Sequence, residues 1–338
     1  FIRIMVSEWS KVDFQSFVNT YSKDMVIDTA PIFLYSKKDK EHEAFNSLIA
    51  FFFIVGFLFI YIALSIILIS VYNNLVLFLI IVILLSITAS ILMINYLLTN
   101  IAIKPKEIWV EVYMGKSVND TKYICLIYYP IFSGICHPNK AKNLIYKLYQ
   151  QEVLETKIDI SQIEVYLKVN DRDYSDYTII GFYFQYGKGQ RFKDEKVNRN
   201  TWQFFPYEKS LNNNFLAVAN WDHQFEWRND LELDYDKLHS YAPWVVQKWD
   251  EESVKPLTDL FKTRQKWELR KIESLPKIMP WEPNFNTTSF ESFKAYKDLQ
   301  IVNEVIEKFL DGNKEIKKIK DVKKDLLKIK SYFRDLEK

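Results

Sequence analysis

An uncharged tract from Ala44 to Ile103 constrains this chain more than any other feature of its sequence. The tract contains no Asp, Glu, Lys, Arg or His, and it divides into apolar runs at residues 48–71 and 75–103 around a polar turn. A helix needs about 20 apolar residues to cross about 30 Å of hydrocarbon. Because each run meets that length, the sequence predicts a two-helix transmembrane hairpin.

Lysines that flank the tract predict its orientation. Three of them precede the first run and two follow the second, whereas the turn carries no charge. They are Lys37, Lys38, Lys40, Lys104 and Lys106. Cytoplasmic loops of membrane proteins carry an excess of Lys and Arg. We therefore expect a multi-pass protein of a cell or organelle membrane with both termini in the cytoplasm.

The residues around the tract fall into three further regions. Residues 1–43 form an N-terminal cytoplasmic segment, in which the spacing of Trp9, Val12, Phe17 and Tyr21 favours a short amphipathic helix. Residues 104–235 alternate between apolar and polar side chains, which predicts strands. The expected strands are at 107–114, 123–132, 163–169, 177–186, 202–207 and 215–219. A helical stripe near residues 144–155 adds an α element, so this region predicts a cytoplasmic α+β domain with an antiparallel sheet.

Helical spacing dominates residues 236–338. Tyr241, Val245 and Trp249 follow a helical period, and a proline-containing linker at 276–289 precedes two further helices. The complete prediction is a membrane-anchored α+β fold: a transmembrane hairpin, then a cytoplasmic antiparallel-sheet domain and a C-terminal helical arm.

The last helix, at residues 314–338, is basic and amphipathic. It carries nine Lys and one Arg against five acidic residues. Such a helix can lie on an anionic lipid surface, pair with a partner helix, or pack on its own domain with a solvated lysine face. The periodicity does not separate these alternatives. The candidate contact residues are Lys317, Lys320, Lys324 and Lys328.

A thiol site is the first candidate for chemistry. Cys136 and His137 stand at an expected strand-to-helix junction, where a helix N-terminus can lower the pKa of a thiol. Cys125 is the second cysteine of the chain, and no C-x-x-C motif is present. Buried, unreactive cysteines are the commoner case, and we favour this interpretation over a catalytic or zinc site.

A metal site is the second candidate. His223, Glu226 and His239 have suitable ligand groups for a divalent cation. However, residues three apart converge only on a helix, and the segment around His223 is expected to be strand or loop. An acidic solvated loop is therefore the favoured interpretation. The many aromatic residues between Trp202 and Trp249 could line an apolar pocket, but core packing explains them more simply.

The sequence favours a non-catalytic role. No phosphate-binding glycine motif occurs, so we expect no cofactor, and the net charge of +2 argues against a nucleic-acid partner. The prediction is an integral membrane protein that presents an interaction or sensing module at the inner membrane face, with the lipid bilayer and a protein, or a second copy, as partners. The alternatives are a membrane-bound enzyme with a metal or thiol site and an oligomeric channel.

Overall fold

The structure is a computed structural model of the whole chain, of which a defined set of residues is described. The described residues are 6–21, 23–36, 56, 86, 104–105, 107–132, 134, 146–148, 150–154, 158–170, 176–187, 202–207, 215–218, 223–228, 244–257, 280–281, 324 and 327.

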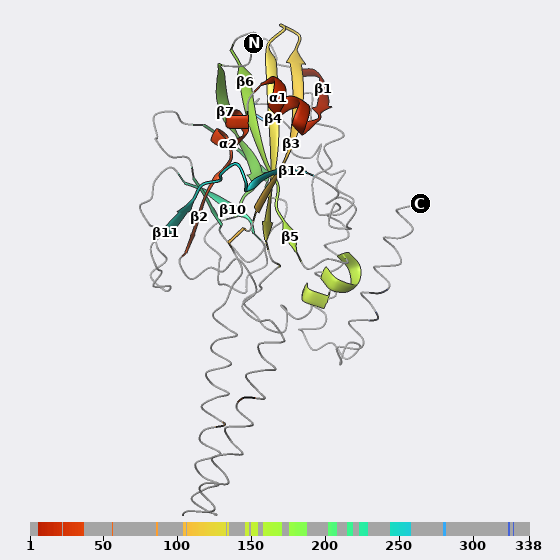
Figure 1. Cartoon of the computed structure of the whole chain (residues 1–338), viewed down its shortest axis with the longest axis vertical. Helices are drawn as coiled ribbons and strands as arrows, with labels where there is room; N and C mark the ends of the chain where they lie inside the picture. Colours follow the sequence, from red (N-terminus) through yellow and green to blue (C-terminus); the bar gives the residue numbers. More distant parts are fainter. Residues whose placement is uncertain are drawn as a thin grey trace, which may run out of the picture.

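A mostly antiparallel sheet of eight strands forms the main body of the described part (Figure 1). Its strand order is β1-β3-β4-β6-β7-β8, with β12 beside β3 and β5 beside β4. The strands are β1 (Val6–Val12), β3 (Glu107–Ser117), β4 (Lys122–Phe132), β5 (Asp159–Ile160), β6 (Ile163–Val169), β7 (Tyr177–Gln185), β8 (Trp202–Pro206) and β12 (Val254–Pro256). The β12 strand is the exception in direction, because it pairs with β3 in parallel.

The hairpin of β3 and β4 is the central pair of this sheet. The two strands pair without a register shift from Glu107 opposite Ile131 to Lys116 opposite Lys122. The connecting turn has Asp120 in the left-handed region, with a φ of 63°. Asp and Asn tolerate this conformation better than most residues. The hairpin confirms the strands predicted from alternation, and so do β6, β7, β8 and β9.

A second sheet of four strands lies beside the first (Figure 1). Its order is β10-β9-β2-β11, from β10 (Phe225–Arg228), β9 (Phe215–Val218), β2 (Ile32–Ser36) and β11 (Trp244–Gln247). The two sheets meet where Tyr186, just after β7, bridges to Phe225 at the start of β10. The Gly187 amide also donates a hydrogen bond of 2.9 Å to the Phe225 carbonyl.

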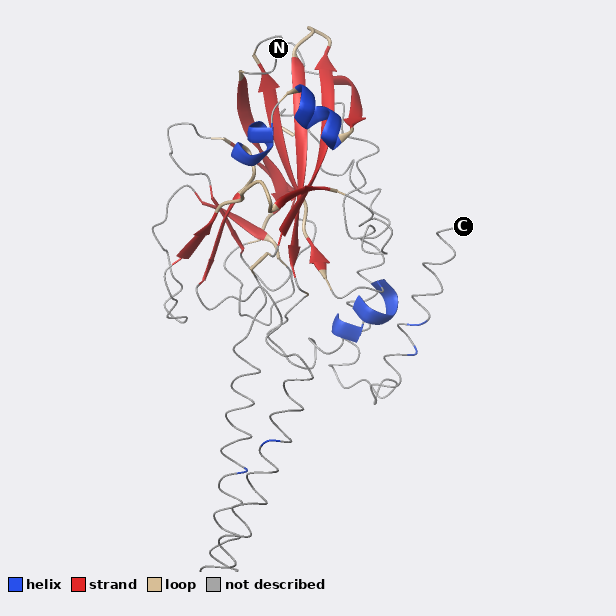
Figure 2. Cartoon of the chain, viewed as in Figure 1, coloured by secondary structure: helices blue, strands red, loops and turns tan. Residues whose placement is uncertain are grey.

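The described helices are short. They are α1 (Phe14–Thr20), α2 (Lys23–Asp28) and the π-helix η1 (Gln150–Leu154). Figure 2 shows α1 and α2 against the larger sheet. The Asp13 side chain caps α1 by accepting a hydrogen bond from the Ser16 amide at 2.9 Å. Phe17 of α1 and Met25 of α2 are buried, so these helices cover part of the sheet.

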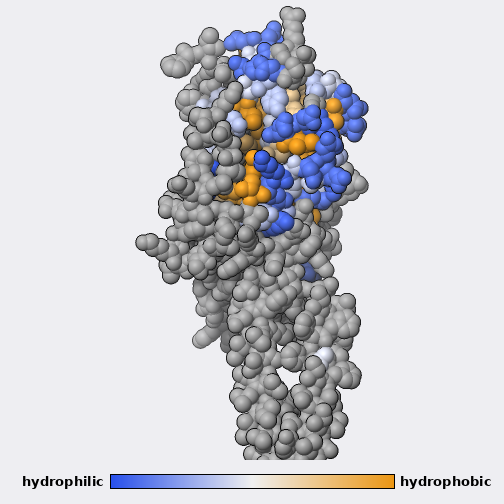
Figure 3. Space-filling model, turned by 60° about the vertical axis from the view of Figure 1, so that its left-hand side comes forward, coloured by the Kyte–Doolittle hydropathy of each residue, from blue (hydrophilic) through white to orange (hydrophobic). Residues whose placement is uncertain are grey.

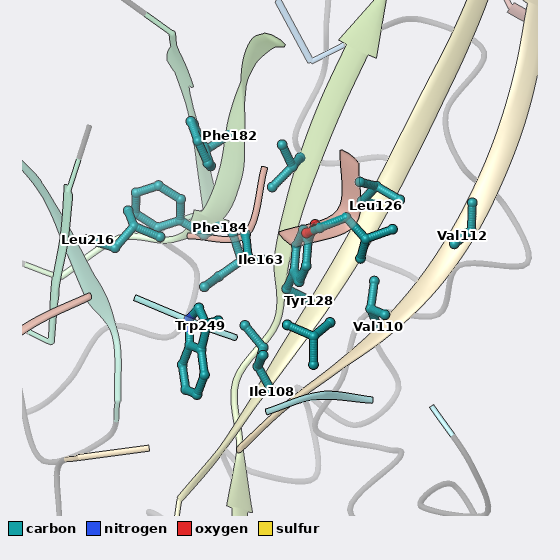
Figure 4. Close-up of a cluster of buried hydrophobic side chains, with 14 of the residues drawn as sticks. Ile108, Val110, Val112, Leu126, Tyr128, Ile163, Phe182, Phe184, Leu216 and Trp249 are labelled. Atoms are coloured by element: carbon teal, nitrogen blue, oxygen red, sulfur yellow. The ribbon is translucent and has the colours of Figure 1, made fainter. Parts of the chain in front are cut away.

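Both sheets and the two helices share one hydrophobic core (Figure 4). The larger sheet contributes residues such as Val110, Tyr128 and Phe184, and the smaller contributes Phe33 and Leu216. Large hydrophobic side chains are exposed at only three described positions: Val118, Val246 and Leu327. Figure 3 shows the hydrophobic surface of one side, bordered by hydrophilic side chains. The apolar side chains of the described part therefore lie mainly inside.

The structure corrects the predicted fold class. The described residues form mostly antiparallel sheet, and none of their helices is both long enough and apolar enough to cross a bilayer. The two-helix transmembrane hairpin is therefore not supported. The multi-pass localisation and the membrane module, membrane enzyme and channel inferred from the hairpin lose their support with it. Of the tract at 44–103, only Gly56 and Ser86 are among the described residues. The length and apolarity of a tract predict that it is shielded from water, but they do not identify the environment that shields it.

Of two further predicted helices, one is confirmed in part and the other is wrong: α1 carries Phe17 of the predicted N-terminal helix. Trp9 and Val12 lie on strand β1, and helix α1 begins only at Phe14. Residues 244–256 contain strands β11 and β12, although the spacing of Val245 and Trp249 predicts a helix. In each case a neighbouring strand offers backbone partners, and this pairing outweighs a local apolar period.

Candidate functional site

The larger sheet has a second face, turned away from the shared core, which we call the outer face. Alternation along β3 sends Val110 to the core and Trp109, Glu111 and Tyr113 to the outer face. Aromatic side chains dominate this face. They are Trp9, Trp109, Tyr113, Tyr123, Tyr129, Tyr166, Tyr183, Trp202 and Phe204.

Trp281 packs on the outer face although it is distant in sequence from its strands. Its ring centroid lies 6.0 Å from that of Tyr123, 5.4 Å from that of Tyr166 and 5.7 Å from that of Phe204. These three residues, which we call the aromatic cradle, belong to β4, β6 and β8. The Tyr166 ring meets the indole at 72°, an edge-on arrangement that aromatic pairs favour.

A buried carboxylate holds one residue of the cradle, Tyr166, in place. Glu164 is fully buried and accepts a hydrogen bond of 2.6 Å from the Tyr166 hydroxyl. The Gln162 amide donates a second bond, of 3.2 Å, to the other carboxylate oxygen. Burying a carboxylate is costly unless such bonds compensate for the lost water. The same bonds therefore stabilise Glu164 and hold the Tyr166 ring in place.

A second carboxylate, Glu111, lies in the same row of the sheet. Glu111 is opposite Ile127 on β4, and Ile127 is opposite Glu164 on β6. At about 4.8 Å between strands, the two backbone positions are about 10 Å apart. Glu111 is 5% exposed, forms an ion pair with Lys11 and accepts a hydrogen bond of 2.9 Å from the Tyr129 hydroxyl. Buried negative charge thus underlies the aromatic surface at two points.

The Tyr129 hydroxyl stays protonated in this environment. Burial raises the pKa of Tyr129 well above its ordinary value, and the negative charge of Glu111 raises it further. A neutral phenol can donate to Glu111, whereas a phenolate would repel it. Tyr129 therefore acts here as a hydrogen-bond donor and not as a general base.

A second polar cluster joins the two sheets. The His223 Nδ1 atom lies 2.5 Å from Oδ2 of Asp159, and both side chains are buried. The His223 ring stacks on Phe132, with a centroid distance of 3.7 Å and an interplanar angle of 4°. The His223 backbone has a φ of 54°, an uncommon conformation for a residue with a side chain. Because Asp159 is on β5 and His223 directly precedes β10, the pair links the larger sheet to the smaller.

The arrangement around His223 does not form a nucleophilic triad. The Ser161 hydroxyl donates a hydrogen bond of 3.0 Å to the backbone carbonyl of His223. In a triad, the hydroxyl would instead donate to the imidazole nitrogen opposite the carboxylate. Since the imidazole side chain also has no exposed surface, the cluster is better suited to holding the sheets together than to acting on a substrate.

The structure separates the residues that the sequence proposes for chemistry. His223 lies in the loop before β10, while Glu226 is within β10 opposite Ala217. Among the described residues, no three His, Cys, Asp or Glu side chains come together in a metal-binding arrangement. Cys136, His137 and His239 lie outside the described residues, and so do Lys317, Lys320 and Lys328. Lys324 is exposed. The catalytic, metal and contact assignments therefore stay untested predictions.

Sequence reasoning missed the residues that form the outer face site. Trp281 falls in a segment assigned as a linker, and a single tryptophan there was the only available signal. Glu111 and Glu164 alternate with core residues on β3 and β6. The sequence therefore places each carboxylate on the same side of its strand as Trp or Tyr side chains, which is an unusual combination. Asp159 gave no signal, because its partner is 64 residues away.

Comparison of the chain with protein-family models, with curated proteins and with solved structures finds no match. The function must therefore be inferred from the geometry of the chain itself.

Proposed function

We propose that this chain is a protein-binding module whose outer face holds a tryptophan-bearing segment of a partner. The single observation that supports this most is the position of Trp281, which lies on three rings from three strands. We interpret Trp281 as an internal occupant of a site that a partner segment can also enter.

The chemistry of the cradle suits an indole ring. The three ring separations, from 5.4 to 6.0 Å, lie within the range in which aromatic pairs attract each other. Each such pair contributes about 0.5–1.5 kcal/mol beyond the burial of apolar area. Tryptophan is also among the residues that dominate the energy of protein interfaces. One inserted indole can therefore supply much of the binding free energy of a short segment.

Strand pairing and a hydrogen bond hold the cradle rings in place independently of Trp281. The rings project from a continuous sheet, in which β4, β6, β7 and β8 pair in order. The hydrogen bond from Tyr166 to Glu164 restricts one of the rings, and Tyr183 packs on Trp202 at 5.4 Å beside them. A preorganised site loses less conformational entropy on binding than a mobile one.

Trp281 sets a minimum affinity that a partner segment needs in order to bind the cradle. Trp281 is covalently part of the same chain, so its segment competes at an effective concentration on the order of millimolar. A partner segment must bind the cradle strongly enough to displace Trp281. Removing the Trp281 side chain removes this competitor. The proposal therefore predicts that a variant without this indole binds such a segment more tightly than the parent does.

The test uses the full chain with Trp281→Ala and a labelled peptide with the sequence of residues 277–285, KIMPWEPNF. We expect fluorescence anisotropy to show binding at least about tenfold tighter for the variant than for the parent. Replacing the peptide tryptophan by alanine should abolish the binding. Adding Phe204→Ala to the Trp281→Ala variant removes one cradle ring and should weaken binding of the tryptophan peptide.

Thermal unfolding monitored by circular dichroism verifies that each variant is folded. If Trp281→Ala does not fold, Trp281→Leu retains apolar volume without the indole and replaces it in the titration. A folded variant that binds the tryptophan and alanine peptides equally, or binds neither, would contradict the proposed function.

A further inference from the structure

Trp9 reaches the aromatic cradle from the edge of the larger sheet. Its ring centroid lies 6.2 Å from that of Tyr166, at an interplanar angle of 69°. Strands β3 and β4 lie between β1 and β6, so the backbones are about 14 Å apart at about 4.8 Å per strand. The side chain of Trp9 must therefore lean across the outer face. Gly115, its partner on β3, has no side chain to prevent this.

The indole N–H of Trp9 is a buried donor that meets no acceptor in the part of the chain that the structure describes. Its Nε1 atom has no hydrogen-bond partner among the described residues. A buried, unpaired donor lowers stability, because it has lost its bond to water and gained none in return. A ligand that brings an acceptor to this atom recovers that loss. An unpaired donor beside an occupied binding site therefore indicates which chemical group is missing from the present occupant.

The charge around the cradle restricts the kind of acceptor. Glu164 is fully buried and bonded to Tyr166, the ring that both Trp9 and Trp281 contact. An anionic ligand group would be repelled by this carboxylate in a weakly screening environment. A neutral carbonyl avoids this repulsion, and the backbone of any peptide supplies one.

We infer that Trp9 is a specificity-determining residue of the site. Its Nε1–H donates to a backbone carbonyl of the bound segment, which selects a peptide tryptophan over a free indole ring. This inference rests on the proposed function and identifies the ligand as a tryptophanyl peptide unit. It adds to the aromatic contacts of the cradle a polar contact that the described residues Pro280 and Trp281 do not make to Trp9.

The experiment compares three small ligands on the full chain carrying Trp281→Ala, by ligand-observed NMR titration. N-acetyl-tryptophanamide has neutral amide carbonyls, 3-methylindole has no strong acceptor, and indole-3-acetate has a charged one. We expect N-acetyl-tryptophanamide to bind about threefold to tenfold tighter than 3-methylindole, the gain of one hydrogen bond. Indole-3-acetate should bind most weakly of the three.

Two substitutions, each added to Trp281→Ala, separate the role of Trp9 from a general effect. Trp9→Phe keeps a ring but removes the donor, and it should abolish the preference while leaving the affinity for 3-methylindole within about twofold. Trp109→Phe is the matched control. It removes another buried, unpaired indole N–H of the outer face, on the adjacent strand β3, and should leave the preference intact.

The outcomes distinguish this inference from the proposed function. If the folded variant binds 3-methylindole and N-acetyl-tryptophanamide equally, or if Trp9→Phe keeps the preference, the inference is overturned and the proposed function stands. An N–H directed at the face of the Tyr166 ring would give this result. If none of the three ligands binds, both the inference and the proposed function fail.

Discussion

Individual side chains on the outer face combine two properties that are seldom found together in a sheet. Tyr129 and Tyr166 contribute to an apolar cluster through their rings, and their hydroxyls bond to buried carboxylates. A phenylalanine at either position would pack similarly but would leave a carboxylate oxygen without that bond. The tyrosines therefore allow negative charge to exist inside an aromatic layer.

Raising the pH should destabilise the fold through its buried tyrosines, Tyr129 on the outer face and Tyr128 in the shared core. Burial raises the pKa of Tyr129 and of Tyr128 above the ordinary value of 10.0, which the unfolded chain retains. The stabilising contribution is complete below about pH 10 and is lost as the pH rises, because only the unfolded state releases the proton. Each tyrosine should contribute about 1.4 kcal/mol of lost stability per pH unit above that point.

Urea denaturation between pH 9 and 11 measures this slope. Tyr129→Phe and Tyr128→Phe should each make it shallower, whatever their effect at neutral pH. An unchanged slope in both variants would contradict the assigned cause.

At the scale of elements, the pairing of β7 with β8 is the most sensitive part of the site. Gly181 of β7 is opposite Pro206, and a Cβ atom added to it would lie 2.3 Å from the Phe205 carbonyl oxygen. The same atom would lie 2.4 Å from the ring of Phe204. The β8 strand can therefore approach β7 only because residue 181 has no side chain.

Gly181→Ala should accordingly displace β8 and the cradle ring that it carries. We expect a loss of about 1–3 kcal/mol in the free energy of unfolding, the usual cost of overfilling a packed site. In the presence of Trp281→Ala, it should also weaken binding of the tryptophan peptide. Thr178→Ser, at an exposed position of the same strand, keeps the hydroxyl that accepts a hydrogen bond from Asn170, so this control should change stability by less than about 0.5 kcal/mol. Equal effects of the two substitutions would refute the steric argument.

At the scale of the whole molecule, the two sheets are coupled by a shared core and by one buried polar pair. The core contains side chains from both sheets, and Trp249 donates a hydrogen bond of 2.9 Å to the Pro31 carbonyl beside β2. The hydrogen-bonded pair of Asp159 and His223 adds a polar link between β5 and the segment before β10. The sheets should therefore unfold together in one transition.

Breaking the polar pair should destabilise the whole described part. Asp159→Leu removes the carboxylate that bonds to the buried His223 ring, which costs about 1–3 kcal/mol. The double variant Asp159→Leu with His223→Phe should recover much of this loss, because it removes both members of the hydrogen bond. A double-mutant cycle in urea measures the coupling, and purely additive effects would show that the pair does not act as a unit.

The sequence alone determined the strands whose side chains alternate within a short window. The β3–β4 hairpin and strands β6 to β9 were predictable because a period of two is visible locally and identifies the two faces. It also placed Trp109 and Glu111 together, opposite Val110. The helix predicted at Val245, and the first half of the helix predicted from Trp9, failed because local spacing contains no information about a neighbouring strand.

Only the tertiary structure decided the site. The cradle joins Tyr123, Tyr166 and Phe204 to Trp281, and the polar pair joins Asp159 to His223, over separations that no periodic pattern records. The register of adjacent strands determines which side chains meet, and it is set by the packing of the whole sheet. The transmembrane hairpin predicted from the uncharged tract is not supported, because no helix among the described residues is long and apolar enough to cross a bilayer.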